Sequence, residues 1–465
     1  MTTCEGFDSP PSVMGAVERI IAIGDVHGDL LFLIELLKIA RVIEKKIFDG
    51  ADDDVNNYIW SGGKTYVVQL GDQIDSCRPT NFLCSEPGRV INDKAEDTKI
   101  INFMDDLDLQ ANKNGGRVIS LLGNHEILNI LGEMSYVSYK NLEESGGVAK
   151  RILAFGPNGE YGRKMICTRP TAVIIGSNLF VHAGILPEII NMIPKLKRIL
   201  KESNVSNGGA QINTKTHEDI LKEFITKCVH GQINRHDLYS LIPNDDKYIR
   251  FWDTIFQGRA RQYSEEHIEK IMKILGKLPK LKTILIQHID KISHMLSELS
   301  GGKPVDNDVE ILNLVIRKWL LGDIDKKYAA DMQKLNSMFW TRILGSLQKN
   351  ENISTNQTCK TIVTPILQMF NVRNMIIAHT PQFDMNQTGI NATCVPNTVL
   401  HSTKQSIVGE DKLHVSQHSL WRVDVGGAKS FDKFDQEYLK TSHNGISRKP
   451  QVLEILNDTH FNILK

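Results

Sequence analysis

Short apolar runs recur along the chain, and most of them end in a Gly-Asp, Gly-Asn or His step. The clearest runs are Ile20–Ile23, Tyr66–Leu70, Val118–Leu122, Leu179–Val181 and Met375–Ala378. Runs of this length that are rich in β-branched residues and bounded by turn residues are typical of buried strands. The pattern therefore predicts a sheet protein in which polar residues follow the strands directly.

Segments with helical periodicity alternate with the first of these strands. Leu30–Ile43 is strongly apolar with polar positions on one side, and apolar residues recur at helical spacing over residues 100–111. Alternation of strand, loop and helix predicts an α/β fold whose ligand groups lie on loops beyond the carboxyl ends of the strands. The turn Gly176-Ser177-Asn178 between two apolar runs predicts an antiparallel hairpin, so a second, mixed sheet is expected.

The pattern changes to long, charged helical segments between residues 191 and 335. Examples are Glu265–Leu275, Leu281–Leu299 and Val309–Leu321. We interpret residues 191–335 as a helical insertion or cap, which either packs against the core or forms a lid over the substrate entrance. The core then consists of residues 17–190 and 336–458, with strand signals resuming after the insertion. A polar stretch at residues 384–419 within it predicts a long loop or an irregular hairpin.

Composition narrows the class of protein. The 465 residues are 41% hydrophobic and 24% charged, which is ordinary for a globular protein. Basic and acidic residues balance at 55 each, so no global field attracts nucleic acid or an anionic membrane. Without a signal-peptide pattern or an apolar run of membrane-spanning length, we expect a cytoplasmic protein. The seven cysteines show no CxxC or zinc-finger spacing, which predicts reduced thiols.

Metal-capable side chains follow several of the predicted strands. They occur in Gly24-Asp25-Val26-His27-Gly28, Gly71-Asp72-Gln73-Ile74-Asp75, Gly123-Asn124-His125-Glu126, His182-Ala183-Gly184 and His379-Thr380-Pro381. Each segment alone also fits a turn with a surface histidine. Together, they offer a carboxylate that can bridge two cations, and imidazoles, carboxylates and an amide oxygen around it. Because loops at strand ends converge, the set predicts one two-metal site.

In this order the motifs resemble those of the calcineurin-like metallophosphoesterases, and within them the phosphoprotein phosphatase branch. Further segments are similar to the Shewanella-like protein phosphatases: Gly159-Glu160-Tyr161-Gly162, Phe339-Trp340-Thr341-Arg342, His379-Thr380-Pro381-Gln382, Arg422-Val423-Asp424-Val425-Gly426 and Pro450-Gln451-Val452-Leu453-Glu454-Ile455. The resemblance covers residues 19–190 and 336–458. It implies an αββα sandwich of two mixed sheets, and hydrolysis of a phosphomonoester by in-line attack of a metal-bridged hydroxide.

The same resemblance implies a role for each site residue. The implied metal ligands are Asp25 and His27 on the first ion, Asp72 between both ions, and Asn124, His182 and His379 on the second. We expect two divalent ions, manganese first, with iron or zinc as alternatives. His125 is implied as the general acid for the leaving oxygen. Asp75 would favour and orient its imidazolium form, and the alternative is that Asp75 only caps a helix.

Arginines are expected to hold the substrate phosphate, because a guanidinium meets two oxygens at once. Arg342 matches a phosphate-binding position of the family. The second family arginine is replaced by Ser76. Either Arg78 reaches the same phosphate, or the second phosphate-binding arginine is missing. The favoured function is a protein phosphatase acting on phosphoserine, phosphothreonine or phosphotyrosine. The alternatives are a hydrolase of small phosphorylated molecules such as dinucleoside polyphosphates, and a phosphate-binding pseudo-enzyme; no nucleic-acid or membrane partner is expected.

Overall fold

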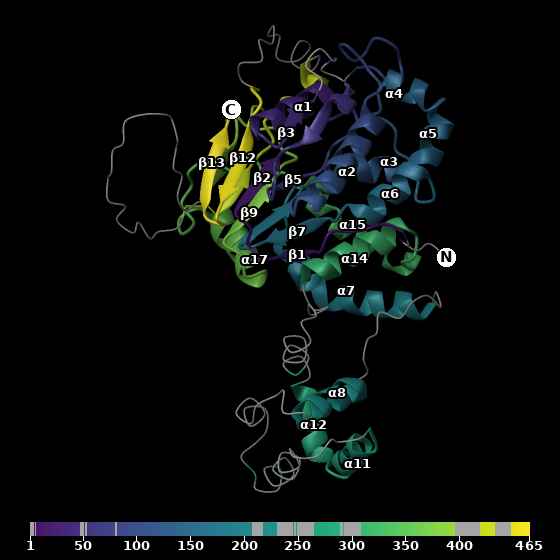
Figure 1. Ribbon diagram of the computed structural model, residues 1–465, viewed down its shortest axis with the longest axis vertical. Helices are drawn as coiled ribbons and strands as arrows, with labels where there is room; N and C mark the ends of the chain where they lie inside the picture. Colours follow the sequence, from purple (N-terminus) through teal and green to yellow (C-terminus); the bar gives the residue numbers. More distant parts are fainter. Residues whose placement is uncertain are drawn as a thin grey trace, which may run out of the picture. The chain divides into compact units, whose positions relative to one another are not determined.

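The computed structural model describes residues 4, 6–46, 51, 54–79, 81–206, 217–229, 245, 248, 265–288, 292, 308–395, 419–432 and 448–465 (Figure 1). The chain divides into a larger unit, residues 1–207 and 308–465, and a smaller unit, residues 208–307. The larger unit includes the helical segments that directly precede and follow residues 208–307 in the sequence, whereas the expected insertion spans residues 191–335. The sequence-based domain boundaries stay a prediction.

One sheet of the larger unit has five strands in the order β13-β12-β2-β5-β6. Their bounds are β2 Arg19–Ile23, β5 Tyr66–Gln69, β6 Arg117–Ser120, β12 Val452–Leu456 and β13 His460–Leu464. β2, β5 and β6 run parallel, and β12 pairs antiparallel with β2 and β13. The parallel strands therefore end at the same edge of the sheet. A separate two-stranded sheet joins β3 Ile43–Lys45 to β4 Tyr58–Trp60.

The other large sheet has six strands in the order β1-β7-β8-β9-β11-β10. Their bounds are β1 Val13–Met14, β7 Ala172–Ile175, β8 Asn178–Val181, β9 Asn374–Ile377, β10 Asn391–Thr393 and β11 Leu420–Arg422. β7 and β8 form the predicted antiparallel hairpin, while β8, β9 and β11 run parallel. This sheet is mixed, as expected. Residues 396–418 of the polar stretch 384–419 lie outside the described residues.

Alternating residues of the six-stranded sheet show that it lies between two layers. Val173, Phe180 and Ile376 belong to the core shared with the five-stranded sheet. Their neighbours Ile174, Leu179 and Met375 belong to a second core that includes apolar residues of the helices α7 and α14. Because successive residues of a strand face opposite sides, the two sheets pack face to face with helices outside them. The predicted α/β sandwich of two mixed sheets is confirmed.

The helices of the larger unit follow the strands closely in sequence. Their bounds are α1 Leu30–Ile39, α2 Asp97–Lys113, α3 Asn124–Ile130, α4 Tyr139–Glu144, α5 Val148–Phe155, α6 Glu160–Thr168, α7 Pro187–Ser206, α14 Asp308–Leu320, α15 Ala329–Leu335, α16 Ser337–Trp340 and α17 Thr364–Met369. The α1 helix starts where the Asp29 carboxylate accepts a hydrogen bond from the Phe32 amide. It ends earlier than predicted, because Arg41 has a left-handed backbone (φ 54°) and Ile43 begins β3.

The described part of the smaller unit is helical. It contains α8 His217–Val229, α11 Glu265–Gly276 and α12 Pro279–Gln287, with Leu281 and Leu285 buried. α12 begins at a proline, which has no amide hydrogen to leave unpaired in a first turn. The predicted helical segment Leu281–Leu299 lies largely outside the described residues beyond His288.

Six cysteines are paired, so the prediction of reduced thiols is wrong for them. The disulfides join Cys4 to Cys167, Cys77 to Cys84 and Cys359 to Cys394, and Cys228 is free and buried. The partners are separated by 163, 7 and 35 residues, which matches no local cysteine motif. Disulfides persist mainly in oxidising compartments, so they remove one argument for a cytoplasmic location.

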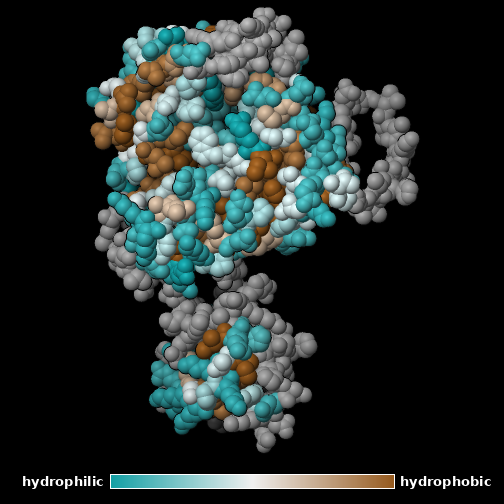
Figure 2. Space-filling view, turned by 180° about the vertical axis from the view of Figure 1, so that it is seen from behind, coloured by the Kyte–Doolittle hydropathy of each residue, from teal (hydrophilic) through white to brown (hydrophobic). Residues whose placement is uncertain are grey.

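Hydrophilic residues cover much of the face seen in Figure 2, with separate hydrophobic areas between them. Exposed large apolar side chains of the larger unit include Leu131, Leu153 and Trp340. In the part of the chain that the structure describes, no helix has the length and apolar character needed to cross a membrane.

Candidate metal centre and active site

The candidate site lies where strands of both large sheets end. Asp25 follows β2, Asp72 follows β5 and His125 follows β6, while His182 and His379 follow β8 and β9. Two of these loops touch through their backbones. A Cβ atom at Gly71 would lie 2.5 Å from the Gly123 nitrogen, and Gly71 also has a positive φ of 94°. Glycine at this position therefore allows the loops to bring their polar residues together.

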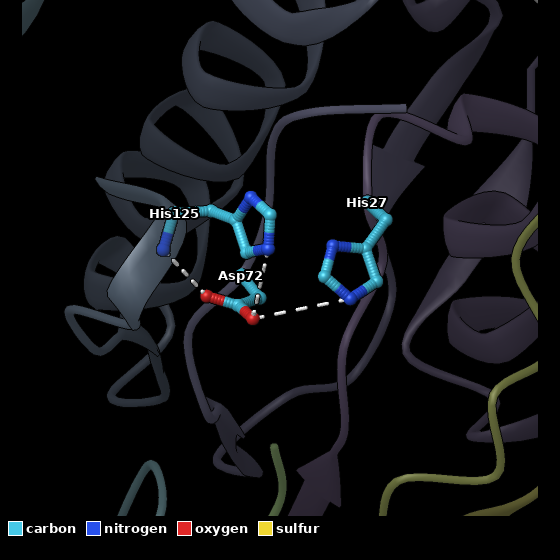
Figure 3. A group of neighbouring side chains, drawn as sticks. All are labelled: His27, Asp72 and His125. Carbon is cyan, nitrogen blue, oxygen red and sulfur yellow. Dashed lines mark hydrogen bonds and ion pairs between the residues drawn. The ribbon is translucent and has the colours of Figure 1, made fainter. Parts of the chain in front are cut away.

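Asp72 lies at the centre of the cluster (Figure 3). Its Oδ1 atom accepts a hydrogen bond of 2.9 Å from the backbone amide of His125. Its Oδ2 atom lies 3.4 Å from Nε2 of His182 and 3.9 Å from Nε2 of both His27 and His125. One carboxylate oxygen thus faces imidazole nitrogens from three different loops, which is the arrangement that a ligand shared by two ions requires.

One side of this centre is formed by Asp25 and His27. The Asp25 Oδ2 atom lies 3.6 Å from Nε2 of His27, and its Oδ1 accepts a hydrogen bond from the His379 amide. Oxygen and nitrogen atoms of His27, Asp72 and His125 approach closely enough to surround one ion. The family resemblance instead implies a leaving-group role for His125, with Asp25 as the partner of His27 on this ion, and this assignment stays a prediction.

The other side contains Asn124, His182 and His379. The Nδ1–H group of His182 donates to the Leu70 carbonyl at 2.7 Å, which leaves Nε2 without a proton in the neutral ring. One end of the Asn124 amide lies 3.0 Å from this Nε2 atom, 2.9 Å from Nδ1 of His379 and 3.2 Å from Oδ2 of Asp72. These three atoms are acceptors, so either the amide NH₂ group or a cation is required among them.

The donor atoms fit a pair of divalent ions. A cation between Asn124, Asp72, His182 and His379 would let the Asn124 carbonyl oxygen face the same point as the other lone pairs. Without an ion, the amide must turn its NH₂ group inward. The chemistry of the set, carboxylate, imidazole and amide oxygen, suits Mn²⁺, Fe²⁺ or Zn²⁺ and does not choose between them.

Burial and neighbouring charges change the proton affinity of the site strongly. Burial, together with the Asp424 and Asp72 carboxylates, raises the pKa of Asp25 well above its ordinary value. Burial opposes the ionisation of Asp72, but the surrounding histidines outweigh it and lower its pKa. Burial likewise opposes protonation of His182, whose pKa is nevertheless raised by Asp72. Burial lowers the pKa of His379 to about 3, which keeps that ring neutral and able to bind a metal.

Several site residues have a left-handed backbone that is unusual for residues other than glycine. The φ angles are 47° at His27, 54° at Asp72, 71° at Asp75 and 65° at His379. Such a conformation persists only where the surrounding structure supports it. For Asp72, this support is the buried Glu126 carboxylate, which accepts hydrogen bonds of 2.8 Å from the Asp72 and Gln73 amides.

His125 and Asp75 form a direct pair beside the centre. Nδ1 of His125 lies 2.8 Å from Oδ2 of Asp75, and both residues are buried. The Asp75 carboxylate therefore accepts the Nδ1–H group and leaves Nε2 on the side of Asp72. Asp75 does not cap a helix through this carboxylate, since its oxygens bind the side chains of His125 and Asn129.

The two arginines adjoin different residues of the centre. Arg78 is partly buried between the rings of Tyr136 and Phe431, and its Nη1 donates to the Asp75 and Cys77 carbonyls. Burial lowers its pKa, while the carboxylates of Asp72, Asp75 and Asp25 act in the opposite direction. The guanidinium therefore lies within electrostatic reach of the centre although it is two positions beyond Ser76.

Arg342 is exposed and adjoins the second side. Its charge contributes to lowering the pKa of His379, after burial and His182. The neighbouring Trp340 has 41% of its surface exposed, and its ring lies 6.0 Å from that of His379. These residues place a cation and an aromatic face next to the metal-binding side chains.

Asp424 is a buried residue of the site that the sequence reading did not assign. It follows β11, which runs parallel to β9, and its Oδ1 atom accepts from the Gly426 amide at 2.8 Å. A side-chain hydrogen bond with Asp25 acts to lower its pKa, but burial outweighs this and raises the pKa to about 6. The rule that strand ends converge applies to β11 as well, so the position of Asp424 after this strand was the available signal.

Comparison with known proteins identifies the family of this chain. A family model described as calcineurin-like phosphoesterase matches residues 18–289, more than half of the 465 residues. The chain therefore belongs to the calcineurin-like phosphoesterase family, whose members are metal-dependent hydrolases. The expected family is confirmed.

Individual relatives include a protein with a Shewanella-like phosphatase name. A Shewanella-like protein phosphatase 2 of Arabidopsis thaliana is 31% identical over 227 residues, which are 40% of this chain and 50% of that protein. An uncharacterized protein of Acanthamoeba polyphaga mimivirus is 25% identical over 378 residues, 78% of this chain and 97% of its own. The crystal structure of a cold-active protein-tyrosine phosphatase of a Shewanella species is 16% identical, covers 98% of this chain and 83% of that one, and has a TM-score of 0.44.

Proposed function

We propose that this hydrolase removes phosphate from phosphoproteins, at serine, threonine or tyrosine, with two divalent metal ions. The observation that carries the proposal is the Oδ2 atom of Asp72, which faces the Nε2 atoms of His27, His125 and His182. In this proposal Asp25 and His27 hold the first ion, and Asn124 and His379 join His182 on the second. When bound, the ions activate a water and neutralise charge on the phosphoryl group.

The remaining chemistry belongs to side chains around the metal ligands. Water attacks phosphorus, and the bond from phosphorus to the leaving oxygen breaks with its electron pair on that oxygen. The leaving oxygen takes a proton from Nε2 of the His125 imidazolium, and the proton lost by the attacking water restores that imidazolium through solvent. The products are an alcohol or phenol and inorganic phosphate. The contact between Nδ1 of His125 and Asp75 supports this role, because it directs Nε2 toward the centre.

Arg78 and Arg342 hold the phosphate in this proposal. Arg78 interacts electrostatically with three carboxylates of the site. This supports the idea that Arg78 takes the place of the family arginine that is missing at Ser76. Arg342 is exposed beside His379 and can form a bidentate contact with phosphate oxygens. An intact set of ligands with two nearby guanidinium groups favours an active enzyme over a phosphate-binding pseudo-enzyme.

Protein substrates are favoured by the open surroundings of the second side. Trp340 and Ile343 are exposed, at 41% and 49%, on either side of Arg342 in sequence. An exposed apolar surface beside a phosphate-binding arginine can contact a peptide chain. The name of the Arabidopsis relative, a protein phosphatase, points to the same substrate class, although this chain spans only half of that protein.

The test is a comparison of substrates with different leaving groups. We expect the manganese-loaded enzyme to hydrolyse 4-nitrophenyl phosphate and phosphopeptides, and dinucleoside polyphosphates much more slowly. His125→Asn should slow a phosphoserine peptide by about a hundredfold or more, because its alkoxide leaving group needs a proton. Nitrophenolate is a stabilised leaving group, so 4-nitrophenyl phosphate should be affected less. No hydrolysis of any of these by the manganese-loaded wild type would refute the proposal.

A further inference from the structure

The pair of His125 and Asp75 continues into a buried polar network. Asn129 of α3 donates from Nδ2 to both carboxylate oxygens of Asp75, at 3.0 Å each. Its Oδ1 atom accepts from Nε and Nη2 of Arg151 on α5, at 3.1 and 3.0 Å. The amide orientation of Asn129 is fixed, because Asp75 can only accept these bonds and Arg151 can only donate.

Arg151 also supports the backbone of Asp75. Its Nη2 atom lies 2.7 Å from Oδ2 of Asp97, the first residue of α2, and Oδ1 of Asp97 accepts from the Asp75 amide at 3.2 Å. Asp75 has a left-handed backbone with φ 71°, which needs support of this kind. The guanidinium therefore reaches Asp75 by two hydrogen-bonded routes, through the Asn129 side chain and through the Asp97 carboxylate. Its Nη2 atom also lies 3.9 Å from Oδ1 of Asp75.

Burial of this network is complete. Asp75, Asn129, Arg151 and Asp97 each have 0% of their surface exposed. The Arg151 guanidinium also stacks 3.5 Å from the ring centre of Phe155. A buried ion pair contributes little net stability compared with apolar residues of the same volume, because both charges lose their water. The buried Arg151–Asp97 ion pair is better explained by its effect on Asp75, which both residues help to hold.

We propose that Asn129 and Arg151 are positioning residues for the general acid, and that they act through Asp75 on the orientation of the His125 ring. This inference rests on the proposed function, in which His125 donates a proton to the leaving oxygen. The Asp75 carboxylate has two oxygens, and it must hold the rotatable imidazole ring of His125 in one orientation. With both oxygens bound by Asn129 and its amide bound by Asp97, the carboxylate has one position in which to accept the His125 Nδ1–H group.

The experiment measures kcat/KM across aryl phosphates of decreasing leaving-group acidity and a phosphoserine peptide, with the full-length manganese-loaded protein. The variants are Asn129→Ser and Arg151→Lys. We expect both to lose about tenfold on the phosphoserine peptide and less than about twofold on 4-nitrophenyl phosphate. The dependence on leaving-group acidity should thus become steeper than in the wild type. Manganese content, measured by elemental analysis, should be unchanged.

A double variant separates positioning from mere support of the fold. In a His125→Asn background, adding Asn129→Ser should change the phosphoserine rate by less than about twofold, because the residue through which Asn129 acts is gone. Equal losses on all substrates, or the same tenfold loss in the His125→Asn background, would overturn the inference. Should Arg151→Lys fail to fold, the Asn129 variants alone decide.

A matched control is Arg317→Lys. This half-buried arginine of α14 donates to the Ile166 carbonyl and the Ser9 hydroxyl, away from the network, and its replacement should leave the leaving-group dependence unchanged. Failure of the two proposals can be told apart. If His125→Asn slows all substrates equally, the general-acid role of His125 fails. If His125→Asn slows poor leaving groups more but the Asn129 and Arg151 variants do not, only the positioning role fails.

Discussion

Asp424→Asn should stabilise the metal-free protein and weaken its binding of metal. The carboxylate is buried beside Asp25. Burial raises its pKa from 3.8 to about 6, although a side-chain hydrogen bond with Asp25 acts in the opposite direction. Because the pKa is raised in the folded state, the neutral carboxyl group favours folding at low pH. This contribution is lost as the pH rises from about 4 through about 6.

The size of the effect follows from this difference in proton affinity. At about 1.4 kcal/mol for each tenfold change, a rise from 3.8 to about 6 corresponds to a destabilisation of about 3 kcal/mol above pH 6. Asparagine has nearly the same shape and no charge, so it should avoid this destabilisation. Its Oδ1 atom can still accept from the Gly426 amide, and its NH₂ group can donate to the Asp25 carboxylate.

The assay is urea unfolding of chelator-treated protein at several pH values. We expect Asp424→Asn to be more stable than the wild type by up to about 3 kcal/mol at pH 7.5, with the gain shrinking as the pH falls toward 4. Titration with manganese should show weaker binding to the variant, because a carboxylate beside the first ion has been removed. A metal-free variant that is no more stable than the wild type at pH 7.5 would refute the reasoning.

Asp331→Asn is a matched control for this experiment. Asp331 is also buried, but it lies 2.6 Å from Nζ of Lys195. Removing its charge breaks an ion pair instead of relieving repulsion. This variant should therefore be equally stable or less stable than the wild type, by up to about 1 kcal/mol.

Further predictions concern the shared ligand and the two arginines. Asp72→Asn should remove the negative charge shared by both ions and abolish turnover while the fold survives. Near-normal activity, with elemental analysis showing that the metals are still bound, would contradict the two-metal centre. Arg342→Ala should raise KM and lower kcat for a phosphopeptide, since the guanidinium acts in both ground and transition states; unchanged kinetics would assign it to the surface. Arg78→Met should weaken inhibition by inorganic phosphate at unchanged manganese content. An unaltered inhibition constant would mean that Arg78 does not bind the phosphate.

The strand ends that carry the site could be predicted from the sequence. Each run of buried apolar residues was followed by a glycine or a metal-capable residue, and the parallel strands β2, β5 and β6 bring these positions to one edge. The positions of Asp25, Asp72 and His182 follow from that rule. The chemical roles of these residues stay a prediction.

Other features depend on contacts between segments far apart in sequence. Arg151 is an ordinary residue of a short amphipathic helix until α5 packs on α3, where it meets Asn129 at a separation of 22 residues. The disulfide of Cys4 with Cys167 joins positions 163 residues apart. The β10 strand is too short and polar to stand out, and it forms by pairing with β11. Local periodicity holds no information about such partners.

The left-handed backbone at His27, Asp72, Asp75 and His379 has a consequence for laboratory evolution. At such angles glycine avoids a steric penalty of roughly 1 kcal/mol or more per position. A selection for thermal tolerance alone would therefore favour glycine or asparagine at these positions and accumulate abundant, inert protein. Libraries screened for heat resistance should keep these codons fixed.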